Sequence, residues 1–212
     1  MMKILVVAAT RAEVSGLYAA FDLPENDFVH SAAFDLLITG VGMTATAFAL
    51  GTTLAAFAYD LVLNLGIAGS FDRGLPLGTV LQVTEDRFSE LGAEDKEDFI
   101  PLETLGFGES CYQGSYRGSS AMVSRLPSVK GITVNTVHGH KATIETVWRR
   151  LQPVTESMEG AAVFYCCSKL KTDCLQVRSL SNYVEERNRE NWQIGPALKN
   201  LNAWAIDFLT NG

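Results

Sequence analysis

The residues best suited to chemistry lie in two neighbouring segments. In residues 153–165 the carboxylate of Glu159 stands at the head of a predicted apolar helix. The first turn of a helix leaves backbone N–H groups unpaired, and these favour an anion. Glu159 is therefore a candidate catalytic or recognition carboxylate, or else a capping acid such as many helices carry. Residues 174–181 predict a buried strand ending at Asn182, where an open α/β sheet places its ligands.

A third candidate acid, Glu13, follows the first predicted strand, the apolar run at residues 3–9. Thr10 and Glu13 have the spacing of a capping box, in which the acid bonds back to the residue that begins a helix. Local geometry thus offers a structural role for Glu13. The sequence by itself does not separate that role from a catalytic one.

Two glycine-rich segments follow predicted strands. Residues 40–45, after the strand at 34–39, have the glycine spacing of a dinucleotide-binding turn. Asp60 argues against that function, because it begins the strand at 61–65, whereas the acid of a dinucleotide fold ends its second strand. Residues 66–70 predict a second glycine turn at a strand's carboxyl end. Two such turns on adjacent strands would line one crevice.

The elements that must position these residues alternate between strand and helix patterns, which allows a single α/β domain over residues 1–212. We also predict strands at 77–84 and 131–137, helices at 141–151 and 195–210, and an acidic, glycine-rich surface excursion at 85–117. The tryptophans Trp192 and Trp204 are expected in the core or in an interface.

Composition favours a small-molecule ligand. The 212 residues are 47% hydrophobic and 19% charged, which suits one well-filled core. A net charge of −7 and scattered basic residues argue against binding to nucleic acid or an anionic membrane surface. No apolar run is long enough to span a membrane and no signal-peptide pattern begins the chain, so a cytoplasmic location is expected. The four cysteines have no C-x-x-C spacing and are predicted to be reduced packing residues.

Two further motifs are weak evidence for a metal site and for a phosphate site. His138 and His140 have the spacing of a ligand pair, but no additional histidine, cysteine or carboxylate has recognisable zinc spacing, so no metal is predicted. Arg73 lies near the second glycine segment and keeps a phosphate-binding loop open as an alternative.

Residues 156–162, Glu-Ser-Met-Glu-Gly-Ala-Ala, followed by residues 177–182, Val-Arg-Ser-Leu-Ser-Asn, resemble the signature of the nucleoside phosphorylase and nucleosidase superfamily. The segment at 181–192 is most similar to the futalosine hydrolase family. The resemblance runs from Met2 to about Leu209 and is weakest at 88–130. It implies one α/β domain whose central mixed sheet is flanked by helices, and a homo-oligomer, a dimer or larger.

The resemblance also implies the chemistry, which is hydrolysis of a purine N-glycosidic bond without a metal or organic cofactor. Glu13 occupies the position of the acid that activates water in these nucleosidases, Glu159 would accept from the ribose hydroxyls, and Asn182 would hold N7 and the 6-substituent. Adenosine-type relatives carry an aspartate where this chain has Asn182. An amide suits a 6-oxopurine, so a hypoxanthine nucleoside is the expected substrate. The family resemblance implies that this nucleoside is futalosine, cleaved in menaquinone biosynthesis to hypoxanthine and dehypoxanthine futalosine.

The residues expected to bind this purine nucleoside, from the same resemblance and from the position of the last loop, are Gly42, Ala68, Gly69, Val137, His138, Met158, Arg187 and Arg189. The base-stacking position falls near Val137 or His138, where related methylthioadenosine nucleosidases have a phenylalanine. Of the two arginines, Arg189 is preferred as the partner of the substrate carboxylate because it is nearer Trp192. Alternatives are a methylthioadenosine/S-adenosylhomocysteine-type nucleosidase, a phosphate-dependent purine nucleoside phosphorylase and a non-catalytic nucleoside-binding protein.

Overall fold

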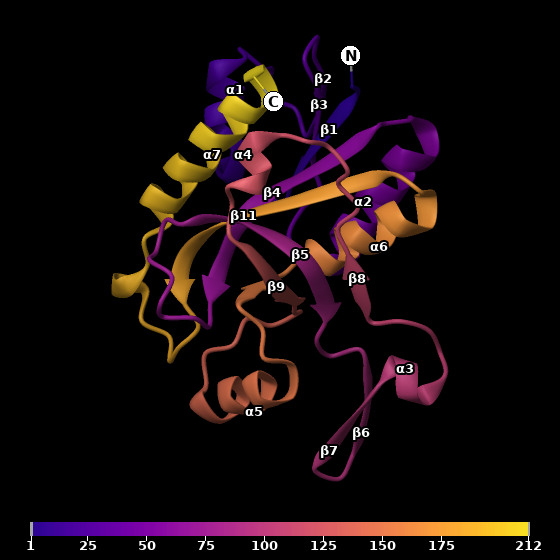
Figure 1. Cartoon of the computed structure of the whole chain (residues 1–212), viewed down its shortest axis with the longest axis vertical. Coiled ribbons are helices and arrows are strands. Elements are labelled where there is room, and N and C mark those ends of the chain that lie inside the picture. The colour runs from indigo at the N-terminus through magenta and orange to yellow at the C-terminus, as the bar shows by residue number, and fades with distance from the viewer. Residues whose placement is uncertain (1, 212) are drawn as a thin grey trace.

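The computed structural model describes residues 2–211, which are organised around one mixed, nine-stranded β-sheet (Figure 1). Its strands are β1 (Ile4–Ala8), β2 (Phe28–His30), β3 (Asp35–Ile38), β4 (Leu61–Ser70), β5 (Val80–Phe88), β8 (Cys111–Gln113), β9 (Ser128–Thr133), β10 (Thr155–Ser157) and β11 (Asp173–Tyr183). The strand order is β10-β9-β5-β11-β4-β1-β3-β2, and β8 pairs with β5. Strands β11, β4, β1 and β3 run parallel, so their carboxyl ends meet at one edge.

Helices cover both faces of this sheet (Figure 1). They are α1 (Ser15–Ala20), α2 (Met43–Ala56), α3 (Leu102–Leu105), α4 (Ala121–Ser124), α5 (Lys141–Leu151), α6 (Gly160–Leu170) and α7 (Ile194–Asn211), with short 3-10 helices η1 (Arg11–Val14) and η2 (Arg189–Asn191). Alternate residues of β1 divide the core: Val6 packs in the cluster that includes α1 and α7, and Leu5 in the cluster that includes α2 and α6. The predicted α/β class with a mixed sheet is confirmed.

The prediction of a glycine turn at residues 66–70 is wrong, because these residues continue β4 as an extended strand. β11 pairs with β4 along one edge, up to Ser70. On the other edge, β1 pairs with residues 61–64 and β10 takes over at Gly69 and Ser70. Two neighbouring strands therefore hold this glycine-rich end straight, an effect that local turn preference does not reveal.

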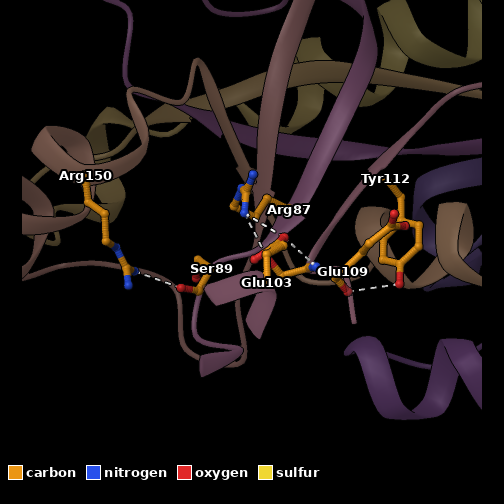
Figure 2. Close-up of polar contacts among 7 residues, drawn as sticks. Arg87, Ser89, Glu103, Glu109, Tyr112 and Arg150 are labelled. Carbon is orange, nitrogen blue, oxygen red and sulfur yellow. Dashed lines mark hydrogen bonds and ion pairs between the residues drawn. The ribbon is translucent and has the colours of Figure 1, made fainter. Parts of the chain in front are cut away.

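The acidic excursion at 85–117 is more structured than predicted. β5 runs on to Phe88, and β6 (Gly92–Asp95) and β7 (Asp98–Pro101) form a hairpin that extends from the body of the molecule (Figure 1). Hydrogen bonds hold the base of this hairpin against the rest of the protein (Figure 2). The Arg87 guanidinium donates to Glu103 at 3.2 Å and to Ser110 at 2.8 Å, and Arg150 of α5 donates to the Ser89 carbonyl at 2.8 Å.

Other element boundaries shift by a few residues. The strand predicted at 77–84 begins at Val80, and the one predicted at 131–137 spans Ser128–Thr133, whereas the helix predicted at 141–151 has those bounds. All four cysteines are free, and Cys166, Cys167 and Cys174 are buried, in agreement with a packing role. Across residues 2–211, no helix combines the length and apolar character that a membrane crossing needs.

Candidate active site

A cavity of about 360 Å³ opens where β1, β4, β10 and β11 end. It is lined by all the residues predicted to form the site except Gly42 and Arg189. The three predicted catalytic side chains thus come from distant parts of the chain to one cavity. The strands β1 and β11, parallel to β4, bring Glu13 and Asn182 to its carboxyl end, and β10, antiparallel to that end of β4, brings Glu159 to the same place.

Glu13 is buried, with its two carboxylate oxygens in different roles. Oε2 accepts hydrogen bonds from the Thr10 backbone N–H at 3.0 Å and the Thr10 hydroxyl at 3.1 Å, as the capping-box spacing predicts. Oε1 accepts from the Ile67 backbone N–H of β4 at 3.1 Å. The capping role therefore uses Oε2 while β4 holds Oε1, and the side chain still lines the cavity, so the two alternatives are compatible.

Glu159 occupies the N-cap position of α6, yet its side chain makes no capping bond to that helix. Its Oε1 instead accepts from the Gly42 backbone N–H at 2.9 Å. Gly42 has φ of +96°, a conformation that favours glycine, which explains why the segment at 40–45 carries glycine. Burial raises the pKa of the Glu159 carboxyl, while the charge of Arg178 and the Gly42 N–H oppose that rise. The capping alternative is excluded.

Asn182 follows an irregularity in the pairing of β11 with β4, between Leu180 and Asn182. Its Oδ1 accepts from the Ser181 hydroxyl at 2.8 Å, and its Nδ2 donates to the Tyr183 carbonyl at 3.0 Å. One lone pair and one N–H of the amide are left for a ligand. A Cβ atom added at Gly69 would lie 3.2 Å from Asn182 Nδ2, so the glycine makes room for this side chain.

Arg178 of β11 is a buried cation next to both acids. It is 1% exposed, and its Nη2 donates to Asn64 Oδ1 at 2.6 Å, while Nε and Nη1 make no hydrogen bond within residues 2–211. A Cβ atom added at Gly66 would lie 2.8 Å from Arg178 Nη1 and 2.9 Å from Glu13 Oε1. The guanidinium and the Glu13 carboxylate therefore lie against the same point of β4, and glycine at position 66 is needed for both.

His138 and Glu156 form a second polar pair in the cavity wall. Glu156 is 4% exposed, and its Oε1 accepts from the His138 backbone N–H at 2.9 Å. Its Oε2 is hydrogen-bonded to His138 Nδ1. The hydrogen bond to Glu156 raises the pKa of the His138 imidazole against the effect of burial, and Glu90 adds to the rise while Arg150 opposes it.

The far end of the cavity is apolar with one cation at its edge. Trp192, Ile194 and Leu198 line it together with Arg187, whose guanidinium lies 5.1 Å from the centre of the Trp192 ring. Trp192, expected in the core or an interface, thus faces the cavity. Arg189 is not among the lining residues, so the placement favours Arg187 over the arginine preferred from sequence.

Comparison with known proteins decides the family. Residues 36–209 match the phosphorylase superfamily. The chain is 33% identical to the futalosine hydrolase of Acidothermus cellulolyticus over 94% of this chain and 87% of the relative, and 30% identical to that of Streptomyces coelicolor over 94% and 92%. The chain belongs to the phosphorylase superfamily. Within it, the chain is a nucleosidase, an N-glycosyl hydrolase.

Solved structures of this superfamily share the fold. The futalosine hydrolase of Helicobacter pylori superposes with a TM-score of 0.78 at 18% identity, over 97% of this chain and 98% of that one. A methylthioadenosine/S-adenosylhomocysteine nucleosidase from Colwellia psychrerythraea, solved with adenine, also gives 0.78, at 20% identity, over 99% and 95%.

Sequence reasoning missed two polar groups of this candidate site. Arg178 could have been noticed, because it is a charged residue inside the apolar strand 174–181 and a buried charge needs a polar partner. Glu156 carried none, because its partner His138 lies 18 residues away in another segment. Within residues 2–211 no cluster of three or more histidine, cysteine or acidic side chains is arranged to hold a metal ion.

Proposed function

We propose that this nucleosidase hydrolyses the N-glycosidic bond of futalosine, releasing hypoxanthine and dehypoxanthine futalosine in cytoplasmic menaquinone biosynthesis. The observation that carries the proposal is one cavity lined by the acids Glu13 and Glu159, the amide Asn182 and, at its apolar end, the cation Arg187. The similarity to two futalosine hydrolases along nearly the whole chain supports the choice of substrate.

Cleavage of the bond between C1′ and N9 leaves the electron pair on the base and positive character on the ribose. Glu159, aimed from the start of α6 and held by the Gly42 N–H, is placed to accept hydrogen bonds from the ribose hydroxyls and to stabilise that charge. The positive charge of Arg178 compensates the negative charges of the two buried acids, Glu13 and Glu159. Its charge lowers the pKa of the Glu159 carboxyl against the effect of burial.

Glu13 acts as general base. Its Oε1 lies at the cavity and takes the proton of a water whose oxygen adds to C1′, while its Oε2 stays fixed by Thr10. The leaving base takes a proton from solvent at N7, and this balances the proton that the attacking water gives to Glu13 and that Glu13 later releases to solvent. Asn182 Oδ1 accepts a hydrogen bond from the new N7–H. The remaining N–H of the amide donates to O6 of a 6-oxopurine.

The far end of futalosine carries a carboxyphenyl ketone. Trp192, Ile194 and Leu198 supply an apolar wall for the ring, and Arg187 supplies the cation for the carboxylate through two parallel hydrogen bonds. Arg187 makes no ion pair within residues 2–211, and Glu185, two residues away, is paired with Arg73. Arg73 is paired with Glu185 and does not line the cavity, which disfavours a phosphorylase.

We also propose that the chain forms a homo-oligomer. Phe48 of α2 and Phe107 after α3 are 74% and 79% exposed. Phe107 lines a groove together with Met43, Phe88, Leu91 and Tyr165. Exposed apolar surface of this kind is typical of a protein interface. Light scattering after size exclusion will give a multiple of 23.1 kDa if this is correct, and the monomer mass if it is not.

The test of function is a panel of nucleosides in phosphate-free buffer, with free base measured by chromatography. Hypoxanthine release from futalosine at a rate far above that of adenine release from methylthioadenosine is the expected result. Preferred cleavage of methylthioadenosine would assign the alternative nucleosidase activity, and base release only after phosphate is added would assign a phosphorylase.

A further inference from the structure

The pair of His138 and Glu156 lies on one side of the cavity and Asn182 on the other. Glu156 in β10 and Asn182 in β11 are both in register with Gly69, on opposite edges of β4. Adjacent strands are about 4.8 Å apart, so the backbones that carry the two side chains are roughly 10 Å apart. Gly69 between them has no side chain. The gap suits a planar purine with polar groups on two of its edges.

Glu156 leaves His138 with one ring nitrogen for a ligand. The backbone N–H and Nδ1 of His138 both bond to the Glu156 carboxylate, whereas Nε2 makes no hydrogen bond within residues 2–211. Resting on the proposed function, we propose that His138, held by Glu156, reads the 6-position of the purine through Nε2–H and selects 6-oxopurine over 6-aminopurine nucleosides.

The selectivity follows from donors and acceptors. A charged imidazole has N–H donors on both nitrogens, and O6 of a 6-oxopurine is an acceptor with two lone pairs, one for Asn182 and one for His138. A 6-amino group presents N–H donors instead, so it would face the Nε2–H donor of His138 in a half-buried part of the cavity wall, with no acceptor for either. A polar group left unpaired by the wrong ligand costs a factor of about 10² or more in kcat/KM.

The surroundings of His138 favour the charged form. Glu156 and Glu90 raise its pKa, and burial and the charge of Arg150 lower it, with a net rise above the ordinary value. The 6-oxo preference should therefore persist above pH 6.5, the ordinary histidine pKa, and decline only as the pH passes the raised value.

The experiment compares kcat/KM for futalosine and its 6-amino analogue from pH 5.5 to 9 in the wild type, His138→Gln, Glu156→Gln and the control His140→Gln. His140 is exposed and two residues away from the proposed reader. We expect His138→Gln to lower the oxo-to-amino ratio by ~10-fold or more, because a glutamine amide can present either its N–H to O6 or its oxygen to a 6-amino group and so removes the preference. Glu156→Gln should shift the pH at which the ratio declines to lower values, and His140→Gln should leave both unchanged.

Calorimetric binding of free hypoxanthine and adenine to the same variants separates this inference from the proposed function. A wild type that cleaves neither nucleoside would refute the proposed function, while a hypoxanthine preference lost in His138→Gln would still support the reader. An equal loss of kcat/KM on both substrates, or of affinity for both bases, would overturn the inference. A pH profile of the ratio that Glu156→Gln does not move would do the same. Either result would give His138 and Glu156 only a structural role in the cavity wall.

Discussion

Replacement of Asp86 by asparagine is expected to stabilise the protein at neutral pH. Asp86 of β5 is 1% exposed and lies under the start of α6, beside the residue that follows Glu159. Its Oδ1 accepts from the Thr133 hydroxyl at 2.9 Å and its Oδ2 from Gln176 Nε2 at 2.8 Å. Thr133 Oγ1 in turn accepts from the Ala161 N–H at 2.7 Å, so the network fixes the helix that begins beside Glu159, the proposed catalytic carboxylate.

The magnitude follows from the pKa of Asp86. Burial raises it from 3.8 to about 6, against opposing hydrogen bonds from Gln176 and Thr133 and the charge of Arg178. A shift of about two units corresponds to roughly 3 kcal/mol at 1.36 kcal/mol per unit. Because the folded protein holds this proton more tightly than the unfolded chain, the free energy of unfolding falls as the pH rises from 3.8 to about 6.

Asparagine has nearly the same shape and no charge to desolvate. Its Oδ1 keeps the bond from Thr133. Its N–H takes the place of Oδ2 and donates to Gln176 Oε1 once the Gln176 amide turns over, so one of the two amide groups of Gln176 stays unpaired, as Oε1 is in the wild type. Some loss of attraction to Arg178 offsets the gain. We therefore expect Asp86→Asn to raise the free energy of unfolding at pH 7.5 by about 1–3 kcal/mol and to leave it nearly unchanged at pH 4.

Urea unfolding at several values between pH 4 and 8, with the m-value checked for each variant, measures this difference. Asp98→Asn, in the exposed tip of the β6–β7 hairpin, is the control for loss of one negative charge and should change stability by less than ~0.5 kcal/mol. Equal pH dependence in the wild type and Asp86→Asn, or a variant that is less stable at pH 7.5, would refute the reasoning.

The remaining predictions concern catalysis. Glu13→Gln and Glu159→Gln should each fold and lose at least ~10²-fold in kcat, and a near-normal turnover rate would remove the residue from the mechanism. Arg187→Ala should lower kcat/KM for futalosine by ~10-fold or more and leave inosine cleavage unchanged, with Arg189→Ala as the matched control; an equal loss on both substrates would make Arg187 a support of the loop. Asn182→Asp should shift the preference toward the 6-amino analogue of futalosine, and an unchanged substrate ratio would contradict the assigned contact with the base.

Local sequence patterns placed Glu13 after the first strand, Glu159 at the start of a helix and Asn182 at the end of a strand, whereas their convergence in one site was implied only by the resemblance to the nucleosidase superfamily. Each of these residues follows a buried apolar strand or begins a helix, and those positions are readable from neighbouring residues alone. The capping-box role of Glu13 was predictable for the same reason, since both partners are three positions apart.

Features that depend on tertiary neighbours were not predictable. The straight path of residues 66–70 requires β10 and β11 on both edges of β4, against the turn preference of glycine. Glu159 accepts a hydrogen bond from the Gly42 N–H instead of capping its own helix, and the two residues are 117 positions apart in the sequence. The choice between Arg187 and Arg189 depends on the path of one loop, where sequence distance to Trp192 was a poor guide to position at the cavity.

The most direct test of the central claim is a single-turnover reaction with futalosine in ¹⁸O-labelled, phosphate-free water, with both products analysed by mass spectrometry. Hydrolysis with Glu13 as base places one ¹⁸O atom on C1′ of the sugar product and none on hypoxanthine, at a rate that added phosphate does not change. A sugar 1-phosphate as product, a requirement for phosphate, or the absence of hypoxanthine release from futalosine would contradict the account.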